Sequence, residues 1–223
     1  KFIGTRPNRP DGFEKVTGRA KYGADISAVG MLHGAVLRSP YAHARIKSIN
    51  FEKAAKLDGV KAIITRDDFP KDRDGEPLKL LENTIAGEVA YYDGHAIAAV
   101  AATSVFTARE ALEEIEVEYE VLPHVLDVDE AMKPDAPIVR KNAGDFSVPD
   151  GSPPNVASYI EFGRGDIANG FDKADIVKSG LFKTEAAHQG YIEPHACMAQ
   201  LDHNGQGEMW VCTQGHWYIR QMC

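Results

Sequence analysis

The sequence predicts an α+β fold, in which short strands and helices follow one another in mixed order. The run from His95 to Ala102 is continuously apolar, which is typical of a strand buried on both faces. Apolar side chains then recur at helical spacing across residues 105–115, with glutamates off that face. Across residues 115–121 apolar residues alternate with glutamates, which indicates a strand with one solvated acidic face.

The segments before these three stretches also mix strands with a helix. Met31–Leu37 is a short apolar run that predicts a strand, and residues 44–49 alternate in a way that predicts a second one. Good helix formers at Phe51–Leu57 predict a short helix. Val60–Thr65 then predicts a third strand. The first part of the chain therefore reads strand, strand, helix, strand.

Two stretches predict irregular connections. Residues 66–88 are charged and broken by Gly and Pro, which predicts a loop, and residues 133–158 carry several prolines, which predicts a long surface connection. Beyond them, Asp166 is the expected N-cap of a short helix followed by a strand. Two further strands are expected on either side of a turn at His203-Asn204-Gly205.

These segments predict four parts of the chain. Residues 1–15, rich in Arg and Pro, form an extended arm, and residues 16–125 form a first unit of strands and helices. Residues 126–160 connect this unit to a second one at residues 161–223, whose pattern of strands is expected to be incomplete at Cys223.

Composition excludes some classes of function. The chain has 223 residues, a hydrophobic fraction of 43% and a net charge of −8, which favours a buried core and disfavours nucleic-acid binding. No apolar run approaches the length of about 18 residues that a membrane span needs. Three cysteines, Cys197, Cys212 and Cys223, form no CxxC pair, which indicates reduced thiols in a cytoplasmic protein and no zinc or iron–sulfur ligand set.

Histidines stand out in three stretches, but their spacing does not favour a metal site. His188 and His195 are seven residues apart with Pro194 between them, whereas the HExxH motif places two histidines one helical turn apart. His43 and His95 lie beside predicted strands, where polar side chains satisfied at strand ends are the simpler interpretation. The GxSxG, P-loop and GxGxxG motifs are absent from the sequence.

The stretch Thr213-Gln214-Gly215 closes a predicted strand that runs to Thr213. The Gln214 amide offers one acceptor and two donors without adding charge, so it can hold an anionic or oxo group. On residue type alone, a solvated glutamine at a strand end is the simpler interpretation.

Six stretches in order resemble one family. The sequence is similar to the N-terminal part of the molybdenum-binding subunit of the xanthine dehydrogenase, aldehyde oxidase and carbon monoxide dehydrogenase family. The resemblance covers about Arg9 to Arg220. The stretches are RPDGFEKVTGRAKYGADI, LHGAVLRSPYAHARIKSIN, GVKAIITRDDF, AREALEEIEVEYEVLPHVLD, GDIANGFDKADIVKSGLFKTEAAHQGYIEPHACMAQLD and WVCTQGHW.

This resemblance implies a fold and an activity. Residues 16–125 would be the α/β-hammerhead domain, and residues 161–223 the beginning of the mixed α/β molybdopterin-binding domain. Enzymes of this family are oxidoreductases that hydroxylate aldehydes or N-heterocycles with an oxygen taken from water. Their molybdenum is held by the dithiolene of a pterin cofactor, here expected in its dinucleotide form. The family's TQ stretch places Gln214 at the cofactor, hydrogen-bonded to an oxygen ligand of molybdenum.

The resemblance also implies missing parts. The family's Gly-rich stretch and catalytic glutamate lie beyond the position of Cys223, so the chain is expected to be a fragment or a split subunit, inactive alone and without a catalytic residue or metal ligand of its own. The remaining molybdopterin-domain polypeptide would be one partner. The 2Fe-2S clusters and FAD are expected on partner domains or subunits. The alternative is a non-catalytic hammerhead module for assembly or small-molecule binding.

Overall fold

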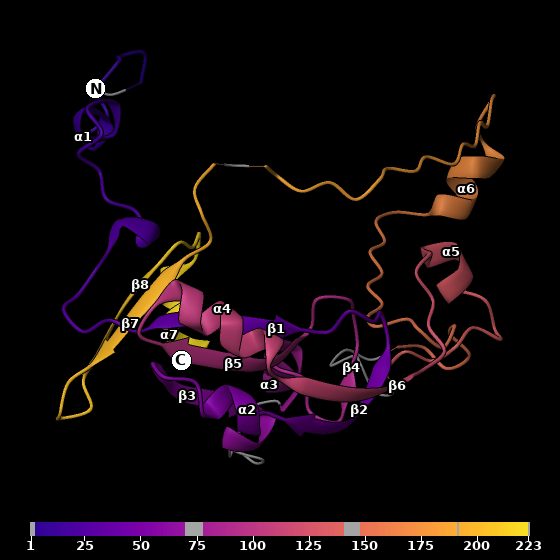
Figure 1. Ribbon diagram of the computed structural model, residues 1–223. Coiled ribbons are helices and arrows are strands. Elements are labelled where there is room, and N and C mark those ends of the chain that lie inside the picture. The colour runs from indigo at the N-terminus through magenta and orange to yellow at the C-terminus, as the bar shows by residue number, and fades with distance from the viewer. Residues whose placement is uncertain (1–2, 70–77, 141–147, 191, 223) are drawn as a thin grey trace. The chain divides into compact units, whose positions relative to one another are not determined.

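Figure 1 shows a computed structural model of the chain, which describes residues 3–69, 78–140, 148–190 and 192–222. Its contacts divide it into two units. The main unit is Leu32–Val177, and the split unit combines Lys1–Met31 with Lys178–Cys223.

The main unit contains a three-stranded antiparallel sheet. β5 (Ala96–Ala102) lies at its centre, between β1 (His33–Arg38) and β3 (Val60–Thr65). Four of the seven residues of β5 are buried, and they point to both faces of the sheet. The strand predicted from the apolar run at residues 95–102 is therefore confirmed.

A second antiparallel sheet places β2 (Ala44–Asn50) between β4 (Val89–Ala90) and β6 (Glu116–Val121). The glutamates of β6 stand opposite cations of β2, with Arg45 3.7 Å from Glu120 and Lys47 4.0 Å from Glu118. All four side chains are about half exposed, so each pair stabilises the fold by little, about 0–1 kcal/mol. The solvated acidic face predicted from the alternation is confirmed.

Two helices pack on the first sheet. α4 (Val105–Glu113) begins at Ser104, whose hydroxyl accepts a hydrogen bond of 3.0 Å from the Thr107 N–H, and it lies along β1 and β5 (Figure 1). α2 (Glu52–Ala55) lies against α4 and β3. The buried residues that join these elements are Ala54, Ala98, Val100, Ala111 and Ile115.

The stretch at residues 66–88 is more regular than the predicted loop. It contains a 3-10 turn, η2 (Arg66–Asp68), and a helix, α3 (Leu78–Thr84), while residues 70–77 lie outside the described part of the chain. Local capping accounts for η2, because the Asp68 carboxylate accepts from the Thr65 N–H at 2.7 Å. The loop prediction was wrong at these two elements.

Side-chain hydrogen bonds to the backbone shape the connection after β6. It includes α5 (Val128–Ala131), which Asp127 caps by accepting from the Asp129 N–H at 2.9 Å. The Asn155 amide accepts from the Val139 N–H at 3.1 Å and donates to the Ala131 carbonyl at 3.2 Å. This Pro-rich segment therefore follows a defined path over its described residues.

One expected strand does not form. α6 (Ile167–Asp172) begins at Asp166, whose carboxylate accepts from the Asn169 N–H at 2.9 Å, so the predicted cap is confirmed. Residues 174–190, however, carry no strand and are exposed. A strand needs a hydrogen-bonded neighbour, and the described residues supply none to this segment, so the prediction of a strand after the capped helix was wrong.

The split unit centres on a hairpin of β7 (Cys197–Leu201) and β8 (Gly207–Val211), whose turn includes Gly205 at a φ of +79°. The predicted hairpin is confirmed. The unit's other elements are α1 (Gly12–Val16), η1 (Gly23–Asp25) and α7 (His216–Met222). The prediction of an extended arm over residues 1–15 is wrong at its end, where α1 forms one helical turn. This turn begins only after Pro10, the last proline of the arm.

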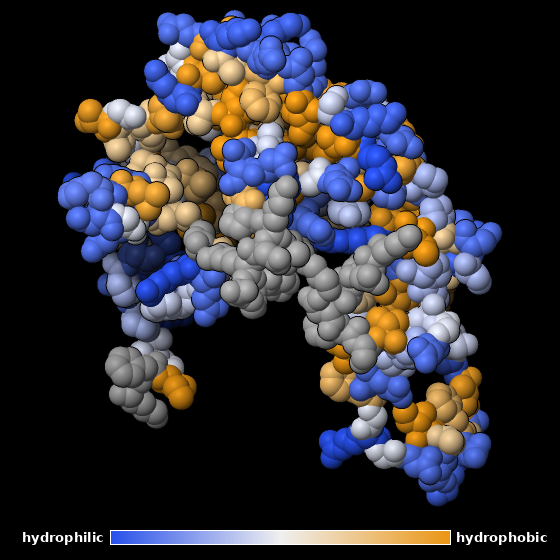
Figure 2. Space-filling model, turned by 90° about the horizontal axis from the view of Figure 1, so that it is seen from below, coloured by the Kyte–Doolittle hydropathy of each residue, from blue (hydrophilic) through white to orange (hydrophobic). Residues whose placement is uncertain are grey.

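The chain leaves many large apolar side chains in contact with water. Figure 2 shows hydrophobic residues interspersed among hydrophilic ones on the face that it presents. Within the split unit, strongly exposed apolar side chains include Leu181, Phe182, Ile192, Leu201 and Trp217. Over the described residues, no helix is both long enough and apolar enough to cross a bilayer.

Candidate functional site

The loop that leaves the β7–β8 hairpin carries the residue predicted to act at a cofactor. β8 ends at Val211, two residues earlier than the strand expected to run to Thr213, and α7 begins at His216. Gln214 lies on the short connection between them and is exposed. The connection itself therefore determines where the Gln214 side chain leaves the hairpin.

Local hydrogen bonds shape this connection. The Cys212 N–H donates to the Ala196 carbonyl at 3.2 Å, which extends the pairing of the hairpin one residue beyond β8. The Thr213 hydroxyl then accepts from the Gly215 N–H at 3.0 Å and closes a tight turn around Gln214. The Gln214 amide itself has no hydrogen-bond partner among the residues that the structure describes.

This geometry fits a ligand with anionic oxygens. The amide N–H groups of Gln214 are solvent-accessible and uncommitted, and they donate without adding charge. On α7, which follows Gln214 in the chain, the Trp217 ring centroid lies 5.3 Å from that of His216, and the Arg220 guanidinium is 6.0 Å from the Trp217 ring. The connection thus carries a neutral donor, and the helix that follows it carries aromatic and cationic side chains.

The other histidines singled out in the sequence are not assembled into a site. The rings of His188 and His195 are 6.3 Å apart in an edge-to-face arrangement. His43 is buried, with its Nδ1 2.6 Å from the Pro123 carbonyl oxygen. Over the described ranges, no group of three or more His, Cys, Asp or Glu residues is arranged to hold a metal ion.

His95 is instead a buried structural residue of the main unit. Its side chain is fully buried, its Nδ1 accepts from the Tyr91 N–H at 3.2 Å, and its ring stacks on Tyr92 at 4.3 Å between centroids. Its Nε2 is buried without a hydrogen-bond partner within the described part of the chain. Because Nδ1 accepts, the proton of the neutral ring lies on Nε2.

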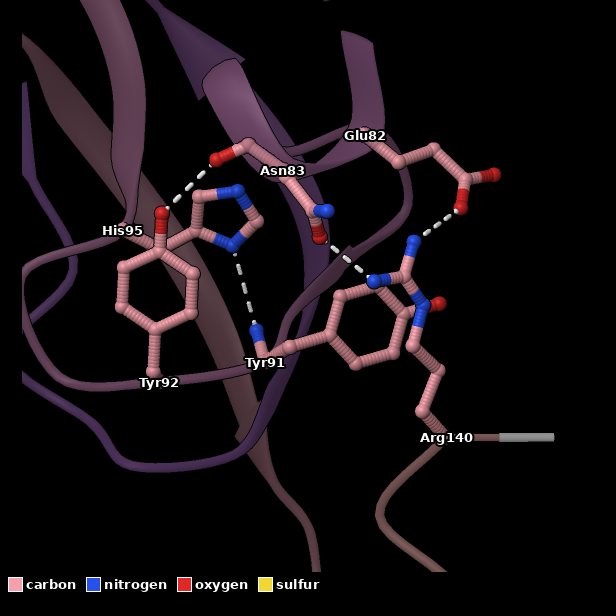
Figure 3. Close-up of polar contacts among 6 residues, drawn as sticks. All are labelled: Glu82, Asn83, Tyr91, Tyr92, His95 and Arg140. Carbon is pink, nitrogen blue, oxygen red and sulfur yellow. Dashed lines mark hydrogen bonds and ion pairs between the residues drawn. The ribbon is translucent and has the colours of Figure 1, made fainter. Parts of the chain in front are cut away.

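Arg140 closes this cluster from a distant part of the sequence, as Figure 3 shows. Its guanidinium pairs with the Glu82 carboxylate at 2.7 Å, donates to the Asn83 side-chain oxygen and lies 4.8 Å from the Tyr91 ring. The Tyr92 hydroxyl donates to the Asn83 carbonyl at 2.8 Å. The cluster therefore ties the connection after β6 to α3 and to the turn before β5.

Burial lowers the pKa of His95 below its ordinary value, and the positive charge of Arg140 acts in the same direction. The backbone carbonyl of Glu82 acts in the opposite direction. Desolvation is the largest of these effects, so His95 is neutral in the folded protein near neutral pH.

Lowering the pH below about 6.5 is therefore expected to destabilise the main unit through His95. The pKa is lower in the folded chain than in the unfolded chain, so the unfolded chain binds more protons in this window. The stability that His95 contributes is present above about pH 6.5 and is lost as the pH falls towards the folded pKa. Urea titrations followed by circular dichroism between about pH 7 and about pH 5 would measure it.

The variant His95→Gln, which does not titrate, should lose less stability over this pH range than the natural chain. His124→Gln is the matched control, because His124 is exposed. An equal loss of stability with pH in His95→Gln and in the natural chain would contradict the assignment.

Comparison with known proteins identifies the family. Residues 17–123 match the family described as aldehyde oxidase and xanthine dehydrogenase, a/b hammerhead domain, and residues 148–223 match the molybdopterin cofactor-binding domain. The chain belongs to the aldehyde oxidase and xanthine dehydrogenase family. In this family member, the hammerhead match holds both sheets of the main unit, and the cofactor-binding match holds the hairpin and Gln214.

The relatives of this family member are much longer than it is. The nicotinate dehydrogenase large molybdopterin subunit of Eubacterium barkeri is 34% identical over 98% of the chain and 49% of that subunit. The carbon monoxide dehydrogenase large chain of Afipia carboxidovorans is 31% identical over 98% of the chain and 28% of the relative. The chain thus spans about half or less of the length of these curated relatives.

Solved structures agree with the family. The chain is 30% identical to the crystal structure of quinoline 2-oxidoreductase from Pseudomonas putida 86, with a TM-score of 0.78. The match covers 100% of this chain and 28% of the oxidoreductase chain. The aldehyde oxidoreductase from Desulfovibrio gigas is 28% identical, with a TM-score of 0.69. That match covers 90% of this chain and 22% of the aldehyde oxidoreductase chain. The mixed α+β fold with a hammerhead domain is therefore confirmed.

Proposed function

We propose that the chain is part of a molybdenum hydroxylase that hydroxylates a carbon centre of an aldehyde or an N-heterocycle with an oxygen from water. Within that enzyme, it contributes one edge of the molybdenum cofactor site through Gln214. The observation that carries this proposal is the exposed, uncommitted Gln214 amide at the end of the hairpin, inside the segment that matches the cofactor-binding domain. When bound, the cofactor would supply the oxidation of the substrate carbon.

The part played by Gln214 is electrostatic. A neutral amide donor, held in place by the hairpin and by the Thr213 turn, would need no reorganisation to donate a hydrogen bond to an anionic oxygen of the bound group. A glutamate at the same position would place a second negative charge against that oxygen. The residue type and its fixed backbone therefore both favour a donor role.

The remaining parts follow the same assignment. Residues 16–125 would form the hammerhead domain, residues 161–223 the beginning of the cofactor domain, residues 1–15 an arm, and residues 126–160 the connection. The cofactor would be a molybdopterin dinucleotide. Further molybdopterin-domain polypeptide would complete the site and cover exposed side chains such as Phe182 and Leu201. The 2Fe-2S clusters and FAD would lie on partner domains or subunits of a cytoplasmic enzyme.

The metal content of the native complex tests this function. Enzyme that contains this chain, isolated from its natural host, is expected to hold molybdenum in stoichiometric amount when measured by inductively coupled plasma mass spectrometry. A stable, metal-free monomer would instead favour the hammerhead alternative, an assembly or small-molecule-binding module. Activity of the chain alone is not informative, because the proposal places most of the site on further polypeptide.

A further inference from the structure

A glycine of the N-terminal segment touches the backbone of the hairpin next to Gln214. A Cβ atom added at Gly23 would lie 2.9 Å from the Ala196 carbonyl oxygen and 3.6 Å from the Cys212 nitrogen. Cβ atoms essentially never approach another heavy atom closer than 3.0 Å, so a side chain at Gly23 would force a shift. Gly23 is not among the glycines with positive φ, so space, rather than backbone conformation, requires glycine here.

The two atoms that Gly23 approaches form the last hydrogen bond before the Gln214 turn. The Cys212 N–H donates to the Ala196 carbonyl at 3.2 Å, one residue beyond the final strand pair of Cys197 with Val211. Gln214 follows only two residues later. Any displacement of this hydrogen bond is therefore passed directly to the turn that carries the amide.

The turn that presents Gly23 is itself held firmly. The Asp25 carboxylate accepts from the Tyr22 N–H at 3.0 Å, and the Asp25 N–H donates to the Tyr22 carbonyl at 2.9 Å. Figure 1 shows this indigo turn, η1, beside the orange and yellow strands β7 and β8 of the same unit. A closed turn in backbone contact with the hairpin end can support that end in one position.

We propose that η1 is a positioning element for Gln214, with Gly23 as the residue that permits the contact. The proposal rests on the proposed function, because it assigns η1 a role only if Gln214 acts at the cofactor. Residues almost two hundred positions away in the sequence would then fix the direction of the donor amide. Gly23 acts through Gln214 and does not itself reach the cofactor.

The variant Gly23→Ala in the complete enzyme tests the contact. Hydrogen exchange, measured by mass spectrometry on peptides that contain Cys212, should be faster in the variant, because the added methyl pushes the Ala196 carbonyl away from the Cys212 N–H. Gly163→Ala is the matched control, since a Cβ at Gly163 meets nothing within 4 Å. Unchanged exchange at Cys212 in Gly23→Ala would overturn the proposal whatever the activity.

Turnover and the paramagnetic resonance spectrum of the molybdenum test the positioning. A displaced donor should lower turnover by about tenfold to a hundredfold at unchanged molybdenum content. The spectrum should shift in the same direction as that of Gln214→Ala. In a double-mutant cycle, adding Gly23→Ala to Gln214→Ala should cost little more, because both changes remove one interaction. Full additivity would overturn the proposal.

The outcomes separate this inference from the function on which it rests. Faster exchange in Gly23→Ala with normal turnover, beside a slow Gln214→Ala, would overturn the positioning role and leave the proposed function intact. Normal turnover in Gln214→Ala would overturn both. If Gly23→Ala does not fold, Asp25→Ala takes its place, because it loosens the turn at Tyr22 without adding volume. Asp25→Ala should change hydrogen exchange and turnover in the same direction as Gly23→Ala, but by smaller amounts.

Discussion

Replacing Gln214 with alanine in the complete enzyme is expected to lower turnover by a factor of about 10²–10³ while molybdenum content and fold are kept. The alanine removes a preorganised donor from an exposed connection, where the backbone bonds of Cys212 and Thr213 do not depend on the lost side chain. Gln214→Glu should also be slow, because a carboxylate has no proton to donate at neutral pH. Steady-state kinetics together with metal analysis would measure both variants.

Gln200→Ala is the matched control for this experiment. Gln200 is an exposed glutamine on β7, in the same hairpin but away from the connection. Near-normal turnover is expected from it. If Gln214→Ala retained the turnover of Gln200→Ala with full molybdenum loading, Gln214 would be a solvated strand-end residue and the proposed site would be wrong.

The largest loss of stability is expected from Ile97→Ala. Ile97 is fully buried in the main unit, with 0% of its surface accessible to solvent. It packs on Ala86 and Ala90 and on side chains of β2 and β6, so it joins the two sheets. Truncation removes buried apolar surface and leaves a cavity, which costs about 2–5 kcal/mol of the free energy of unfolding. Urea denaturation of the chain, followed by circular dichroism, measures this cost.

Ile64→Ala separates burial from residue type. Ile64 lies on β3 of the same sheet as Ile97, but 37% of its surface is exposed. Truncating Ile64 should lower the free energy of unfolding clearly less than truncating Ile97, because part of the removed surface is exposed to solvent in the folded protein. Equal losses in the two variants would show that the sheets are not joined through Ile97.

Most strands and the helix α4 could be predicted from the sequence because their periodicity is local. The acidic alternation of β6, the apolar run of β5 and the cap at Ser104 are each properties of fewer than ten neighbouring residues. The helix α3 was not predicted, because the charged composition around it resembles a loop. The strand expected after the helix capped by Asp166 was wrong, because pairing depends on a neighbouring strand that no local pattern reveals.

The candidate site shows the same division. The amide chemistry of Gln214 can be read from residue type, but its place at a cofactor was inferred only from the resemblance of the TQ stretch to a family. Neither the Arg140–Glu82 pair nor the Gly23–Ala196 contact could be predicted, because each joins segments far apart in the sequence. A glycine that is needed for space looks like any other glycine until its neighbour is known.

In the core of the main unit, α2, β5 and α4 contact one another through alanine side chains. Ala54 of α2, Ala98 of β5 and Ala111 of α4 are all fully buried in one cluster. Methyl groups leave no long side chain that could rotate aside, so the spacing between helices and sheet is set by the backbones themselves. Over evolution, these three positions should therefore accept almost no increase in volume, and the hammerhead domain should vary at its surface and loops before it varies here.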